Sequence, residues 1–266
     1  MTSEQLPEPR RSRGVYLLPN LFTTAALFCG FYAIIAALNS RFEPASIAIF
    51  IAMVLDGLDG RVARLTHTES EFGAQYDSMA DLVSFGLAPA LLMYEWALGG
   101  MVEMGPFYSK LGWLAAFFYT VMAALRLARF NVQLGSADKR YFTGLPSPSA
   151  AAVVAGMVWI CTDLGLTGPQ MLWPSLLITV GAGALMFSNI LYFSFKQLDL
   201  HSRVPFMAVL IIVLIFVFTS MDPPKILFFG FLTYGLSGPA LFLWRWWLRS
   251  RRRSKTEPVN PNPSVK

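Results

Sequence analysis

The chain has 266 residues, of which 55% are hydrophobic and 14% charged, and its formal net charge is +5. A soluble domain carries roughly a quarter of charged residues, so this composition, with a mean hydropathy of +0.51, excludes an ordinary soluble protein. Cys29 and Cys161 lie far apart in apolar runs, which excludes a disulfide-stapled secreted scaffold. We therefore expect one integral membrane domain with short polar ends.

The apolar runs predict the membrane domain in chain order. Residues 1–14 are polar and form an expected cytosolic tail, and the first apolar run lacks the features of a cleaved signal peptide. About eight runs approach the ~20 residues that a helix needs to cross a membrane. The sequence thus predicts an all-α integral membrane protein with a transmembrane domain over residues 15–250 and spans near 17–38, 44–65, 73–98, 108–132, 149–166, 170–195, 205–220 and 226–247.

Basic residues predict the orientation of these spans. With the N-terminus in the cytosol, the cytosolic tails and loops hold 18 of the 21 Lys and Arg residues. Since Lys and Arg concentrate in cytoplasmic loops, both termini are expected in the cytosol, and the basic balance does not indicate nucleic-acid binding. The cluster at 249–255 either anchors this topology or attracts anionic lipid headgroups. Residues 251–266 are predicted to form a disordered basic cytosolic tail.

Four aspartates interrupt the second and third apolar runs. Asp56 and Asp59 lie in the second run, and Asp77 and Asp81 lie in the third. A charge inside the membrane is costly and by default indicates a functional site. The i,i+3 and i,i+4 spacings place each pair on one helix face. Because the link 65–72 is short, the two helices are expected to be antiparallel neighbours, with all four carboxylates meeting near the cytosolic face.

A group of four carboxylates needs protons or hard cations to offset its repulsion. Oxygen ligands suit Mg²⁺, Mn²⁺ or Ca²⁺ better than zinc, and two neighbouring divalent ions assist phosphoryl chemistry. Gly57 and Gly60 leave room for a substrate beside the acids, although glycines in membrane helices also serve close packing. Arg64 on the same face either binds a phosphate or marks the cytosolic end of the helix.

Written in full, the pattern resembles the signature of the CDP-alcohol phosphotransferase family. It reads Asp56-x2-Asp59-Gly60-x2-Ala63-Arg64-x8-Gly73-x3-Asp77-x3-Asp81. Segments 19–24, 84–90, 126–131 and 142–148 further resemble the bacterial and archaeal branch of this family that uses serine. The likeness is closest over about residues 15–160, and Ala26 stands where many relatives have Asn.

The resemblance implies a reaction and a set of site residues. CDP-diacylglycerol would be the donor and L-serine the acceptor, giving phosphatidylserine and CMP. Two Mg²⁺ or Mn²⁺ ions would be held by Asp56, Asp59, Asp77 and Asp81, and Asp81 would also act as the general base. Contacts to CDP-diacylglycerol are implied for Asn20, Gly60, Ala63, Arg64 and Ser70. The motif holds no strong nucleophile, so we expect direct displacement without a covalent intermediate.

Serine recognition needs a cation for the serine carboxylate. Arg126 and Arg129 are the available cations near the cytosolic end of the fourth run, and Asn131 is close to them. An alternative is that both arginines serve only the positive-inside bias. The resemblance also implies a homodimer, embedded among membrane lipids in a bacterial or archaeal inner membrane, with its active site facing the cytosol.

Other functions remain open at the level of sequence. The same chemistry could use glycerol 3-phosphate, inositol phosphate or choline as the acceptor, and only the resemblance of segment 144–148 favours serine. A cation-coupled transporter also keeps acids within the membrane, but the aspartate pattern has no second copy in residues 108–266. A non-catalytic scaffold gives no reason for four such acids.

Overall fold

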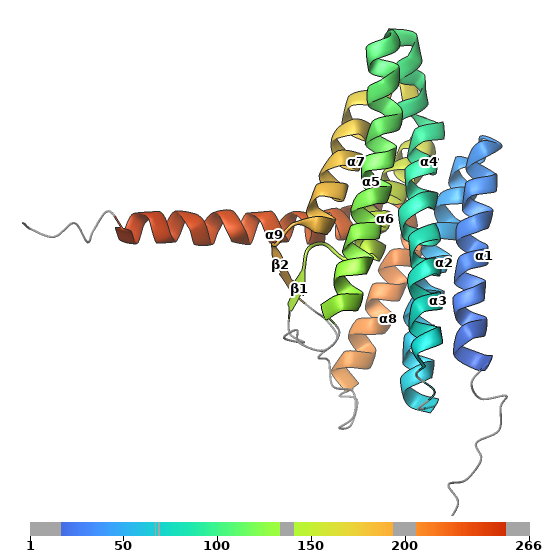
Figure 1. Ribbon diagram of the computed structural model, residues 1–266, viewed down its shortest axis with the longest axis vertical. Coiled ribbons are helices and arrows are strands. Elements are labelled where there is room, and N and C mark those ends of the chain that lie inside the picture. The colour runs from blue at the N-terminus through green and yellow to red at the C-terminus, as the bar shows by residue number, and fades with distance from the viewer. Residues whose placement is uncertain (1–16, 67, 69, 134–140, 194–205, 254–266) are drawn as a thin grey trace, which may run out of the picture.

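Figure 1 shows the computed structural model, which describes residues 17–66, 68, 70–133, 141–193 and 206–253. Long helices stand side by side and form most of the described chain. The α-helices are α1 (Leu17–Leu38), α2 (Phe42–Thr66), α3 (Glu71–Asp81), α4 (Ala88–Trp96), α5 (Pro106–Gln133), α6 (Ser147–Asp163), α7 (Leu172–Phe187), α8 (Phe206–Met221) and α9 (Pro223–Arg253). Shorter helical turns are η1 (Leu82–Leu87), η2 (Leu98–Met104) and η3 (Gly168–Met171).

Every apolar run in the sequence is largely helical in the structure. Within the described residues, five helical stretches are long and apolar enough to cross a membrane: Pro19–Leu38, Glu71–Met104, Pro106–Val132, Gly168–Phe187 and Pro223–Trp244. The second half of α2 carries two aspartates and two arginines, and α6 and α8 have only 17 and 16 residues. An all-α membrane protein is thereby supported, whereas eight spans and two cytosolic termini stay predictions.

Helix α6 forms the centre of the core. Most of its side chains are buried, and it packs against α2, α4, α7 and α9. Small residues allow this close approach, as the run Ala150–Ala152 and Gly156 illustrate. A Cβ atom added to Gly156 would lie 3.2 Å from the Cα of Phe228 in α9. The small residues of α6 therefore let a neighbouring helix such as α9 pack close to its backbone.

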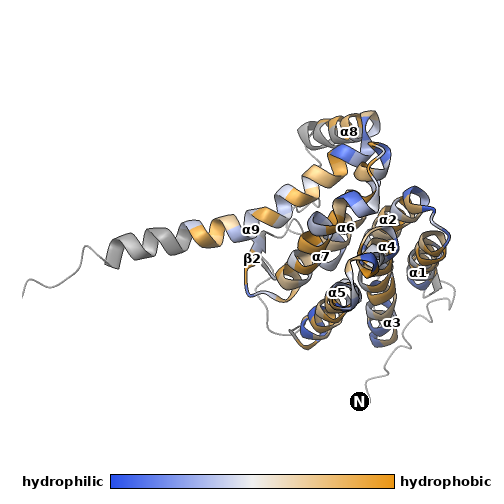
Figure 2. Ribbon diagram, turned by 90° about the horizontal axis from the view of Figure 1, so that it is seen from above, coloured by the Kyte–Doolittle hydropathy of each residue, from blue (hydrophilic) through white to orange (hydrophobic). Residues whose placement is uncertain are grey.

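The last helix has a different direction from the others. Figure 1 shows α9 lying across the upright helices, and Figure 2, seen from above, shows it leaving the group beside α6. Asp222 precedes α9 and accepts a hydrogen bond of 2.5 Å from Lys225 Nζ, which lowers the pKa of this half-buried carboxyl. The predicted tail at 251–266 begins within α9, which ends at Arg253. Residues 254–266 and the predicted tail 1–14 lie outside the described residues.

A small sheet interrupts the all-helical pattern. Strand β1 (Tyr141–Thr143) pairs antiparallel with β2 (Leu191–Phe193). After β1, Gly144 takes a φ of +84° and its N–H donates to the Ile190 carbonyl at 2.8 Å. A Cβ at Gly144 would lie 2.2 Å from the Met186 carbonyl oxygen. This sheet joins the connection before α6 to the end of α7.

Candidate active site

Helices α2 and α3 bring their aspartates together. One carboxylate oxygen from each of Asp56, Asp59 and Asp77 lies within 4.8 Å of the other two. Asp81, one turn beyond Asp77, lies within electrostatic range of Asp56 and Asp77. The convergence that the i,i+3 and i,i+4 spacings predict is therefore confirmed for Asp56, Asp59 and Asp77. Asp59, Asp77 and Asp81 share a cavity with residues from the start of α1 and the end of α5, and these two helix ends lie at the same end of the bundle (Figure 1).

A cavity of ≈ 420 Å³ opens beside this cluster. It is formed by the start of α1, the end of α2, the start of α3 and the end of α5. All five residues expected to contact CDP-diacylglycerol line it, together with three of the four acids. The lining residues are Pro19, Asn20, Thr23, Asp59, Gly60, Ala63, Arg64, Thr68, Ser70, Gly73, Ala74, Asp77, Ser78, Asp81, Leu127, Phe130 and Asn131.

Helix α1 orients one of the carboxylates. The Thr23 hydroxyl donates to Asp59 Oδ2 at 2.8 Å, and Asp59 is buried. On the neighbouring residue, Thr24 Oγ1 lies 2.9 Å from the Tyr76 hydroxyl of α3. The motif at 19–24 contains both threonines, but sequence reasoning assigned neither of them a role. The one available signal was that Thr23 follows Asn20 at i,i+3 and so shares its face of the helix.

The glycines beside the acids face open space. A Cβ added to Gly57 or Gly60 would meet nothing within 4 Å. By contrast, a Cβ on Gly30 in α1 would lie 2.5 Å from Ser84 Oγ. Helix packing therefore explains Gly30 but neither of the two glycines beside the acids. Since Gly60 also lines the cavity, its exposed backbone allows a ligand to approach.

The beginning of α3 complements the acids with positive potential. Ser70 caps this helix, and its Oγ accepts a hydrogen bond of 3.0 Å from the Gly73 N–H. Helix N-termini attract anions because their N–H groups and dipole point outwards. Arg64 lines the same cavity. The cavity thus offers carboxylates for cations and positive groups for a phosphate.

The residues expected to bind serine lie in different surroundings. Asn131 lines the cavity and donates to Ser78 Oγ at 3.0 Å. Arg126 donates to Ser147 Oγ at 2.6 Å and lies within electrostatic range of Asp81. These contacts bring Asn131 to the cavity wall and Arg126 beside the acidic cluster. Their role in serine binding stays a prediction.

Arg129 is held by the end of α7. Its guanidinium carbon lies 4.2 Å from the centre of the Phe187 ring, and Nη1 donates to Asn189 Oδ1 at 3.0 Å. Its Nη2 also donates to the Phe187 carbonyl. Arg129 does not line the cavity described above.

The chemistry of the donor set fits Mg²⁺ or Mn²⁺. These hard cations prefer carboxylate oxygens, and the lining residues include no histidine or cysteine.

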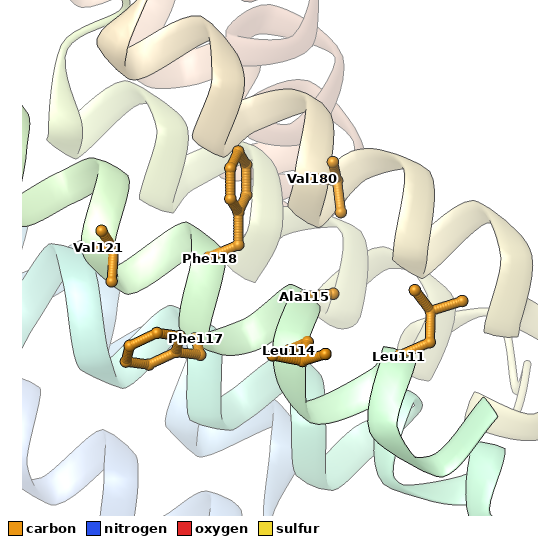
Figure 3. Close-up of a pocket in the computed structure, with 7 residues that line it drawn as sticks. All are labelled: Leu111, Leu114, Ala115, Phe117, Phe118, Val121 and Val180. Carbon is orange, nitrogen blue, oxygen red and sulfur yellow. The ribbon is translucent and has the colours of Figure 1, made fainter. Parts of the chain in front are cut away.

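A second cavity of ≈ 370 Å³ offers a contrast (Figure 3). Its lining is wholly apolar and comes from α5 and α7, namely Leu111, Leu114, Ala115, Phe117, Phe118, Val121 and Val180. Of these two cavities, the first therefore has the groups that can carry chemistry on a phosphate.

Comparisons with known proteins agree with this geometry. The family model described as CDP-alcohol phosphatidyltransferase matches residues 16–183. A CDP-diacylglycerol–serine O-phosphatidyltransferase of Helicobacter pylori is 33% identical over 224 residues, which cover 84% of this chain and 90% of the relative. Proteins of the same name from Mycobacterium leprae and Methanocaldococcus jannaschii are 31% and 35% identical. Their alignments cover 88% and 54% of this chain, and 76% and 61% of the relatives.

Proposed function

Because the chain belongs to the CDP-alcohol phosphatidyltransferase family, we propose that it transfers the phosphatidyl group of CDP-diacylglycerol to L-serine. The products are phosphatidylserine and CMP. The observation that carries this proposal is the cluster of Asp56, Asp59 and Asp77, in which one carboxylate oxygen of each residue lies within 4.8 Å of the other two. The choice of serine is supported by the names of the relatives.

In this proposal the four aspartates hold two divalent cations. Asp56, Asp59, Asp77 and Asp81 would be the ligands of two Mg²⁺ or Mn²⁺ ions. When bound, these ions neutralise charge on the diphosphate and on the departing CMP. Thr23 supports the assignment because its hydrogen bond holds Asp59 in one orientation, as the outer partners of metal ligands commonly do.

The residues of the cavity wall bind and orient the donor. Arg64 and the start of α3 at Ser70 attract the diphosphate, and Asn20 and Ala63 contact the CDP part. Gly60 lets the donor approach the backbone of α2, since a Cβ there would occupy open space. The site lies at one end of the bundle, so the acyl chains can stay in the membrane while the nucleotide reaches water.

Asp81 acts as the general base. It accepts the proton of the serine hydroxyl while the serine oxygen attacks the phosphorus of the phosphatidyl group. The bond between that phosphorus and the CMP oxygen breaks, and CMP leaves with the electron pair. The cavity lining offers no cysteine and no Ser–His pair, which favours direct displacement. Rapid-quench kinetics should therefore show no burst of CMP before serine is added.

The remaining proposals concern the acceptor and the assembly. Arg126, Arg129 and Asn131 would recognise serine, and the position of Asn131 in the cavity wall supports its part most directly. The protein would form a homodimer in a bacterial or archaeal inner membrane, with the active site facing the cytosol. These assignments follow the family resemblance and the distribution of basic residues.

An acceptor assay tests the proposed function. The purified full-length protein is given CDP-diacylglycerol and Mn²⁺ with serine, glycerol 3-phosphate, inositol phosphate or choline in turn. We expect CMP release with serine alone, and none from an Asp77→Asn control. CMP release with a different acceptor would replace serine in the proposal. If none of the four acceptors supported CMP release, the proposal of phosphatidyl transfer would be overturned.

A further inference from the structure

The helix that carries Asp77 and Asp81 widens directly after Asp81. Residues Leu82–Leu87 form the π-helical turn η1, in which the Ala88 N–H donates to the Val83 carbonyl, five residues back. A π turn accommodates one residue more than an α turn, so it rotates the preceding segment by about 100° around the helix axis. The following helix α4 is fixed in the core. The wide turn therefore sets the direction in which the two aspartates point.

The sequence contains a cause for this turn. Pro89 has no N–H, and in an α-helix its ring would clash with the carbonyl four residues earlier, that of Phe85. Phe85 is fully buried, so its carbonyl needs another partner. Tyr119 of α5 supplies it, since its hydroxyl donates to the Phe85 carbonyl at 3.0 Å. Tyr119 is itself completely buried, so water cannot take its place.

The opposite side of the turn is fixed to α1. The Ser84 hydroxyl donates to the Ala26 carbonyl at 3.1 Å, and a Cβ on Gly30 would lie 2.5 Å from Ser84 Oγ. Helices α1 and α5 thus hold η1 from two sides. Both helices also reach the acidic end of the bundle, α1 through Thr23 and α5 through Asn131.

We propose that Tyr119 is a positioning residue for the acidic cluster. Pro89 has no N–H to donate to the Phe85 carbonyl, and the Tyr119 hydroxyl donates to this carbonyl instead. That hydrogen bond holds the π turn in place. The π turn in turn rotates Asp77 and Asp81 towards Asp56. This inference rests on the proposed function, because it treats the cluster as a site for divalent cations.

The test measures Mn²⁺ affinity of the full-length protein without substrate, by electron paramagnetic resonance of free Mn²⁺. Tyr119→Phe is compared with Tyr192→Phe, whose buried hydroxyl donates to the Gly235 carbonyl at 2.9 Å. Both variants lose one buried hydroxyl, so both should unfold at a lower temperature. Only Tyr119→Phe should weaken Mn²⁺ binding, by about tenfold or more, as loss of outer support for metal ligands does.

A second pair of variants separates rotation from stability. Pro89→Ala restores an N–H for the Phe85 carbonyl, so the turn can close to an α-helix. We expect this variant to unfold no earlier than the wild type and yet to bind Mn²⁺ more weakly. Pro239→Ala, which removes the proline inside α9, should keep wild-type affinity.

The outcomes distinguish this inference from the proposed function. Wild-type Mn²⁺ affinity in both Tyr119→Phe and Pro89→Ala would overturn the positioning role alone. Equal weakening in Tyr119→Phe and Tyr192→Phe would also overturn it, because a general loosening would then explain the loss. A wild-type protein that binds no Mn²⁺ would overturn the metal site and, with it, this inference.

Discussion

Thr23 holds Asp59 by a single hydrogen bond across two helices. Its hydroxyl lies 2.8 Å from Asp59 Oδ2, and valine has nearly the same shape without the hydroxyl. We predict that Thr23→Val weakens Mn²⁺ activation about 10- to 100-fold, the usual cost of losing a partner of a metal ligand. The measurement is the Mn²⁺ concentration that gives half-maximal CMP release at saturating serine.

Thr24→Val is the matched control for this substitution. Thr24 is the next residue on the same helix, and its hydroxyl has a partner at a similar distance, the Tyr76 hydroxyl at 2.9 Å. Because this pair includes no carboxylate, the Mn²⁺ requirement should stay close to that of the wild type. An equal shift in both variants would mean that α1 as a whole, rather than Thr23, supports the site.

The acids could be predicted from sequence because their spacing is local. Residues three or four apart share a helix face. Two adjacent helices are therefore enough to bring together Asp56, Asp59, Asp77 and Asp81. The partner of Thr23 depends on how α1 is rotated against α2, which no local pattern records. Arg129 shows the same limit, because the Phe187 ring that its guanidinium contacts is 58 residues away in the chain.

At the scale of elements, Gly144 joins the small sheet to α7. Its φ of +84° disfavours any side chain, and a Cβ would lie 2.2 Å from the Met186 carbonyl oxygen. We predict that Gly144→Ala lowers the free energy of unfolding by about 1–3 kcal/mol or more. Thermal unfolding of the detergent-solubilised protein measures this change.

Gly181→Ala in α7 provides the control. A Cβ there meets nothing within 4 Å, and alanine stabilises a helix interior by roughly 0.5–1 kcal/mol relative to glycine. This variant should unfold at the same temperature as the wild type or slightly higher. If Gly144→Ala behaved like Gly181→Ala, the turn would not depend on its left-handed conformation.

The long helices were predictable, whereas the elements that depend on distant contacts were not. Runs of about 20 apolar residues are sufficient to indicate helices, and each predicted run is largely helical. The strands have only three residues each and pair Tyr141 with Phe193, so neither has a readable period. Pro89 was the one local signal of the π turn, but the direction of the distortion depends on Tyr119.

At the scale of the molecule, α5 connects the two ends of the helix bundle. Its last residues line the cavity of the acidic site, and its first residues lie at the opposite end (Figure 1). Val132 is 86% exposed near the site end, and Val102 is 61% exposed just before α5 begins. Helix α5 has 28 residues, so at 1.5 Å per residue it is about 42 Å long. This length exceeds the ≈ 30 Å hydrocarbon core of a bilayer, and the two positions should therefore lie on opposite sides of the membrane.

Cysteine labelling tests which side holds the site. In a background of Cys29→Ser and Cys161→Ala, Val132→Cys should react with a membrane-impermeant maleimide in inside-out vesicles and be protected in right-side-out vesicles. Val102→Cys should show the reverse pattern, because the distribution of basic residues predicts that the end of α5 lies in the cytosol. Labelling of Val132→Cys from the outside would contradict a cytosolic active site. Labelling of both positions from one side would contradict a membrane-crossing α5.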